Sequence, residues 1–112
     1  MINIIVLFRA LLVAPLLVSI SGPSNDVVTL PRDRVNLEAV ARGPDGKKLN
    51  GFDLVWRWSA DVGPEVKLKD IDKDKLTISE LKPGEYIFTA SVTASKHNRS
   101  VKVFIRVSRE ND

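Results

Sequence analysis

Three aspartates at alternating positions, Asp70, Asp72 and Asp74, have the spacing of the first ligands in a calcium-binding loop. Clustered carboxylate oxygens are the ligands that a hard cation prefers. The rest of the loop pattern is missing, because Lys75 stands where the sharp turn needs glycine and Leu81 stands where the bidentate glutamate should be. We therefore predict an exposed acidic turn, with its charge offset by neighbouring lysines, and no metal site.

Residues suited to catalysis are scarce in this chain. Cysteine is absent and histidine occurs once, which excludes thiolate nucleophiles, disulfides and multi-histidine metal centres. The single His97 lies between Lys96 and Arg99, and no neighbouring carboxylate would orient it as a base. The sequence also has no G-x-S-x-G elbow and no phosphate-binding glycine loop. We predict a protein that is not an enzyme and binds no cofactor, with His97 exposed in a loop.

One triplet, Asn98-Arg99-Ser100, has the pattern of an N-glycosylation acceptor. It falls in a polar stretch that we predict to be a loop, where a glycan would be accessible. The motif has meaning only if the chain enters the secretory pathway. Asn98 is therefore a predicted glycosylation site on that condition.

The first 21 residues differ in composition from the rest of the chain. Residues 4–20 are almost wholly apolar, and the stretch after Arg9, Ala10–Ile20, falls within the roughly 7 to 15 residues of a signal-peptide core. Small residues precede Gly22, where cleavage would occur. We predict a signal peptide or apolar leader over residues 1–21. Two alternatives stay open, an uncleaved membrane anchor, for which the stretch is short and Arg9 costly, and a truncated start.

The remaining chain has the composition of one small globular domain, which we place at residues 22–108 with a tail at 109–112. Lys and Arg number 17 against 14 Asp and Glu in the 112 residues, and the two signs are interleaved. This pattern is typical of a solvated surface rather than a nucleic-acid footprint, so no nucleic-acid partner is expected.

Apolar residues after Gly22 alternate with polar ones, and Gly, Pro, Asn and Asp separate the runs. Seven short strands in about 90 residues favour an all-β, antiparallel sandwich of the immunoglobulin type. The predicted strands are Val27–Leu30, Val35–Ala41, Leu54–Ser59, Glu65–Lys69, Lys75–Ser79, Tyr86–Thr93 and Val101–Val107. Gly43–Gly46 is predicted to reverse the chain between the second and third strands.

The alternation also assigns the core. Tyr86 and Phe88 share the inward face of one strand, and Trp56 and Trp58 share that of another. Trp58 is our choice for the centre of the core, whereas Trp56 has the alternative of stacking on a ligand. Tyr86 follows a Pro-Gly turn, so we expect its hydroxyl to bond to the backbone a few residues upstream, as in a tyrosine corner.

Three apolar residues point to the opposite, outer faces of their strands: Val55, Ile87 and Phe104. We expect the three strands to be neighbours in one sheet. If the three side chains cluster, they form an exposed apolar patch, which on a secreted domain indicates contact with another protein or domain. We take them as the candidate interaction face.

Several segments together resemble a PKD (polycystic kidney disease) domain, an immunoglobulin-like sandwich of extracellular proteins. These segments are Val18–Pro23, Val27–Pro31, Val35–Leu37, Gly43–Gly46, Trp56–Trp58 and Leu76–Phe88. More narrowly, they resemble the first PKD repeats of the dyslexia-associated PKD-repeat membrane glycoproteins, the family that includes the adeno-associated virus receptor. The resemblance places the first strand at about Val18–Gly22, so cleavage after Ser21 would remove part of it.

The resemblance implies a non-enzymatic module for protein interaction or cell-surface adhesion, in proteins linked to neuronal migration and vesicle trafficking. Its partners would be another protein or neighbouring PKD repeats, in the extracellular space or the secretory lumen. A membrane would be involved only through an uncleaved leader or the remainder of a longer glycoprotein, of which this chain would be a fragment. The alternatives are a carbohydrate-binding accessory module of a secreted protein and a structural spacer.

Overall fold

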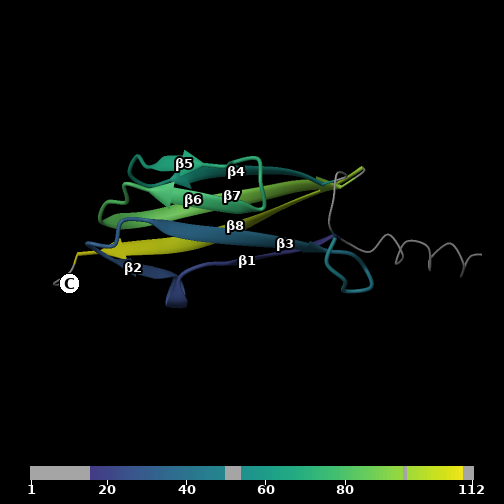
Figure 1. Ribbon diagram of the computed structural model, residues 1–112, viewed down its shortest axis with the longest axis horizontal. Coiled ribbons are helices and arrows are strands. Elements are labelled where there is room, and N and C mark those ends of the chain that lie inside the picture. Colours follow the sequence, from purple (N-terminus) through teal and green to yellow (C-terminus); the bar gives the residue numbers. More distant parts are fainter. Residues whose placement is uncertain (1–15, 50–53, 95, 110–112) are drawn as a thin grey trace, which may run out of the picture.

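Eight strands in two facing sheets make up the part of the chain that the computed structural model describes, residues 16–49, 54–94 and 96–109 (Figure 1). The strands are β1 (Leu17–Ser21), β2 (Val27–Thr29), β3 (Val35–Arg42), β4 (Leu54–Val62), β5 (Lys67–Lys69), β6 (Lys75–Ser79), β7 (Gly84–Ala94) and β8 (His97–Ser108). A short 3₁₀ turn, η1 (Ser24–Asp26), links the first two. The predicted all-β sandwich is therefore confirmed.

The first sheet has the strand order β1-β3-β6-β5, and the second has the order β2-β8-β7-β4. All pairs are antiparallel except β2 and β8, which are parallel, so the second sheet is mixed rather than antiparallel as expected. The exception arises because the chain crosses from one sheet to the other between β1 and β2 without reversing. Gly22 lies at this crossing, where a Cβ would come 2.6 Å from the Leu37 side chain.

All seven predicted strands are present, but the last hairpin is longer than expected. β7 begins at Gly84 and β8 begins at His97, whereas we had placed the sequence before Val101 in a loop. Residues 97–100 are exposed on both faces of β8, so their side chains show no alternation of apolar and polar character. The prediction of a loop around His97 and Asn98 was wrong for this reason.

The eighth strand, β1, comes from the end of the predicted leader. It pairs with β3 from Leu17 opposite Arg42 to Ser21 opposite Glu38, which agrees with the first strand implied by the resemblance. Residues 1–15 and 110–112 lie outside the described residues, as does most of the predicted leader. Within the described ranges, no helix is long and apolar enough to cross a membrane.

The core between the sheets contains the residues that the alternation placed there. Trp58, Tyr86 and Phe88 are each at most 2% exposed, and they face Leu37 and Ile78 of the opposite sheet. The Trp58 indole N–H donates to the Lys73 carbonyl at 2.7 Å, which satisfies the one polar group of that ring. Trp56 is 9% exposed and belongs to the same core.

Two turns also follow the sequence. Gly46 has φ +82° and donates its N–H to the Gly43 carbonyl at 2.9 Å, so the predicted turn reverses the chain after β3. After β6, the chain passes to the other sheet through Lys82, and Tyr86 then opens the buried part of β7. The Tyr86 hydroxyl donates to the Lys82 carbonyl and accepts the Lys82 N–H, both at 2.9 Å, which confirms the tyrosine corner.

Candidate interaction face

The outer face of the β2-β8-β7-β4 sheet carries the three apolar residues that we had singled out. Ile87 of β7 lies directly opposite Phe104 of β8, so their side chains are neighbours on this face. Phe104 is 55% exposed and Ile87 is partly buried. These two residues therefore form a cross-strand apolar pair, as the prediction required.

Val55 does not join this pair. It is 64% exposed but lies opposite Thr93, six residues along β7 from Ile87, which corresponds to about 20 Å. The expectation that the three residues form one patch was wrong, because strands that are neighbours in a sheet do not by themselves fix which residues lie side by side. Val55 is an isolated exposed side chain at the other end of the face.

Two residues that the sequence did not indicate take its place. Val62 lies opposite Ile87 and is 52% exposed, and Val27 lies opposite Arg106 and is 41% exposed. We call Val27, Val62, Ile87 and Phe104 the apolar strip. Large exposed apolar side chains gathered in one place are unusual on a small domain, whereas single ones are common.

A bulge in β4 brings Val62 to the outer face. Regular alternation from Trp56 and Trp58 would point Val62 into the core, but the register shifts between Ala60 and Val62. The inserted residue is Asp61. A bulge adds one residue to a strand and so reverses the alternation beyond it. Asp61 stands at a position where regular alternation also expects a polar residue, so the sequence carried no signal of the bulge.

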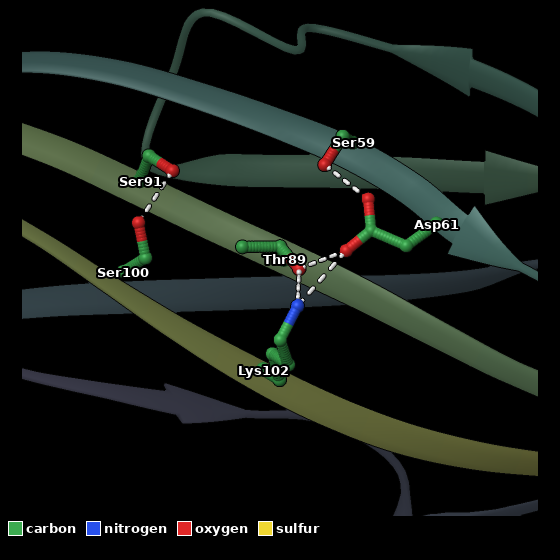
Figure 2. Close-up of polar contacts among 6 residues, drawn as sticks. All are labelled: Ser59, Asp61, Thr89, Ser91, Ser100 and Lys102. Atoms are coloured by element: carbon green, nitrogen blue, oxygen red, sulfur yellow. Dashed lines mark hydrogen bonds and ion pairs between the residues drawn. The ribbon is translucent and has the colours of Figure 1, made fainter.

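Asp61 is the centre of a polar cluster beside the strip, shown in Figure 2. Its carboxylate accepts hydrogen bonds from the Thr89 hydroxyl and from the Ser59 hydroxyl, the latter at 2.8 Å. The Lys102 ammonium lies 3.3 Å from the same carboxylate and 3.2 Å from the Thr89 hydroxyl oxygen. Thr89 is 8% exposed, so this cluster ties β4, β7 and β8 together under a partly solvated surface.

These contacts hold the pKa of Asp61 below its usual range. The Thr89 and Ser59 hydroxyls stabilise the charged carboxylate, Lys102 adds to the effect, and partial burial opposes it. Asp61 is therefore ionised at neutral pH and saturated with donors from its own sheet. Its surroundings suit a structural role at the bulge rather than proton transfer, which needs a pKa near the working pH.

The acidic turn lies between β5 and β6, in the sheet opposite the candidate face. Asp70 adopts φ +67° and its carboxylate lies 3.7 Å from the Lys73 ammonium, so this lysine offsets part of the charge there. Among the described residues, no three His, Cys, Asp or Glu side chains gather as metal ligands would.

The polar residues of the last hairpin lie at its tip. Asn98 is exposed and lies opposite Thr93, on a strand rather than in the predicted loop. It points to the same outer face as Phe104, because both are even-numbered residues of β8. His97 is exposed opposite Ala94, at the start of β8.

Neither tryptophan offers a stacking platform. Trp58 and Trp56 both pack in the core, at 2% and 9% exposure. The ligand-stacking alternative for Trp56 therefore loses its geometric basis. Among the described residues, Phe104 is the aromatic side chain that is largely exposed.

Comparison with known proteins agrees with this architecture. Residues 22–107 match the family described as "K319L-like, PKD domain". Among solved structures, the PKD domain of human KIAA0319 superposes with a TM-score of 0.63 at 23% identity, covering 82% of this chain and 81% of that one. The PKD domain of the KIAA 1837 protein gives a TM-score of 0.61 at 24% identity, covering 77% and 81%.

A more distant likeness extends to the S-layer protein SbsC, domains 4 and 5. The TM-score is 0.50 at 16% identity, with 85% of this chain and 54% of that chain covered. No curated protein matches the sequence. At such identities, the solved structures establish the fold, and the family match establishes the kinship.

Proposed function

The chain belongs to the K319L-like PKD domain family, and on that basis we propose that it is a non-enzymatic, extracellular or lumenal module for protein interaction or cell adhesion. The fold is that of a typically non-catalytic module. The narrower roles that the family resemblance implies, at cell and vesicle membranes and in neuronal migration, belong to this proposal.

The apolar strip is the observation that carries the proposal. Its members come from all four strands of one sheet, and three of them, Val27, Val62 and Phe104, are between 41% and 55% exposed. Exposing these side chains to water is unfavourable, and covering them with another protein surface removes that cost. The polar cluster around Asp61 fixes the backbone of three of these strands, so the strip is a preformed surface.

The first and last strands place the two ends of the domain where tandem repeats could be joined end to end. β1 begins at one end of the long axis in Figure 1, and β8 ends at the other. Further repeats joined at those ends would follow one another along a line and leave the outer face of each sheet open. Neighbouring repeats and a separate protein are therefore both compatible as partners.

The proposal predicts that the folded chain binds to cell surfaces through the apolar strip. We expect fluorescently labelled chain to bind intact mammalian cells saturably, and the double variant Ile87→Ser, Phe104→Ser to lose at least about tenfold in affinity, as removal of a central apolar contact does. Flow cytometry over a concentration series measures this.

The variant Val55→Ser is the matched control. It removes an exposed apolar side chain from the same face at a distance from the strip, and its binding should equal that of the unchanged chain. Circular dichroism establishes that each variant is folded. Equal binding by the double variant and the control would overturn the assignment of the surface, and absence of saturable binding would contradict the adhesive role.

A further inference from the structure

Charges in the two rows beside the Ile87–Phe104 pair are sorted by strand. In the row next to the Ile87–Phe104 pair, Glu85 of β7 lies opposite Arg106 of β8. In the row on the other side of the pair, Thr89 of β7 and the Asp61 carboxylate bonded to it lie opposite Lys102 of β8. In these two rows, the acids are thus on the β7 and β4 side, and the bases are on β8.

The side chains of Glu85 and Arg106 have no ionic partner among the described residues of the domain. Both side chains are exposed, and neither forms an ion pair or a side-chain hydrogen bond with any other residue in the described part of the chain. Asp61 and Lys102, in contrast, are already paired with each other. One acid and one base beside the apolar strip therefore remain available to a partner.

This pattern is complementary to itself. Consider a two-fold axis that lies above the outer face, parallel to the strands and midway between β7 and β8. Rotation about it would place a second copy face to face with the first, with the second copy's β7 over the first copy's β8. Because such a rotation keeps the rows in register, Ile87 would meet the second copy's Phe104, and Glu85 would meet its Arg106. Each contact would occur twice, as in any isologous interface.

The remaining members of the strip fit the same arrangement. Val62, on the β4 side, would approach the β2 side of the second copy, where Val27 is exposed. The apolar side chains would form the centre and the charged pairs the border, which is the usual anatomy of a protein interface. Two sheets packed face to face with nearly aligned strands are a stable arrangement.

We propose that the outer face of the β2-β8-β7-β4 sheet binds a second copy of this chain, with Ile87 against Phe104 at the centre and Glu85 against Arg106 beside it. This inference rests on the proposed function and names the partner of the same surface. The opposite charges favour this orientation of the second copy, and the apolar side chains of the strip are removed from water at the interface.

Charge reversal tests the inference, with sedimentation velocity as the readout. The unchanged chain should shift from monomer toward twice the monomer mass as its concentration rises. The single variants Glu85→Arg and Arg106→Glu should each dissociate at least about tenfold more readily, because like charges would then face each other across the interface.

Mixing the two single variants is the decisive arm. The Glu85→Arg copy carries a base at both positions 85 and 106, and the Arg106→Glu copy carries an acid at both, so each contact of the mixed pair joins opposite charges. The equimolar mixture should therefore form a heterodimer at concentrations where each variant alone is dissociated. A defect in folding would not be rescued by mixing, so this arm separates the interface from stability.

Three results would overturn the inference: an unchanged chain that is monomeric at all concentrations, single variants that associate like the unchanged chain, or a mixture that remains monomeric. The variant Val55→Ser, outside the strip, should associate normally. If the chain did not self-associate but Ile87→Ser, Phe104→Ser still lost cell binding, the second copy would be excluded as the partner. The proposed function would then stand.

Discussion

Replacing Trp58 with alanine is expected to lower the free energy of unfolding by about 3 to 5 kcal/mol, the range for removing a large aromatic side chain from a core. The indole is 2% exposed and lies between the two sheets, so its removal leaves a cavity that a sandwich cannot easily close. The variant also leaves the Lys73 carbonyl without the indole N–H, which it accepts at 2.7 Å. Urea denaturation followed by circular dichroism measures the change.

Arg57→Ala is the matched control, because Arg57 is the neighbouring residue on β4 and points to solvent. A substitution there should change stability by no more than about 0.5 kcal/mol. If Trp58→Ala and Arg57→Ala unfolded at the same urea concentration, Trp58 would not be the centre of the core.

Tyr86→Phe should cost roughly 1 to 3 kcal/mol, although it removes a single oxygen atom. That oxygen donates to the Lys82 carbonyl and accepts the Lys82 N–H. Both backbone groups would lose their partner at a place where the chain passes from one sheet to the other. The ring itself, stacked on Phe88 with centroids 5.7 Å apart, would stay in position.

Ser91→Ala is the corresponding control for the loss of a hydroxyl. Ser91 makes one hydrogen bond, to the exposed Ser100 hydroxyl at 2.9 Å, so its loss should be nearly neutral. Chemical denaturation of the three proteins compares them directly. An unchanged midpoint for Tyr86→Phe would mean that the corner does not stabilise the fold.

The sandwich could be predicted because its core depends on local patterns. Trp58, Tyr86 and Phe88 stand at alternate positions within strands, and a Pro-Gly turn precedes Tyr86. Alternation within a strand and turn chemistry are properties of neighbouring residues, so one sequence is enough to detect them.

The features that were missed depend on contacts between distant segments. The parallel pairing of Val27 with Arg106 joins the two ends of the domain, and no local pattern encodes it. The tip of the last hairpin, around Asn98, resembles a loop because water covers both of its faces. The strand Leu17–Ser21 was indicated by the family resemblance and not by its composition, which is apolar like that of the residues before it.

The interaction face was predicted where it depends on local alternation and missed where it depends on the pairing of strands. Ile87 and Phe104 stand out of phase with the core residues of their strands, which indicated exposure. Val62 stands in phase with Trp58, and only the bulge at Asp61 turns it outward. Grouping residues across strands requires the register, and that is why Val55 was wrongly included.

The intact mass of the chain expressed in a secreting eukaryotic cell tests whether this module works outside the cell or in the secretory lumen. A module that works outside the cell or in the secretory lumen should leave the cell carrying a glycan on Asn98, which is exposed at the hairpin tip. We expect a mass that falls on treatment with an N-glycosidase, and an Asn98→Gln variant without that difference. An unmodified chain retained in the cytosol would contradict the claim.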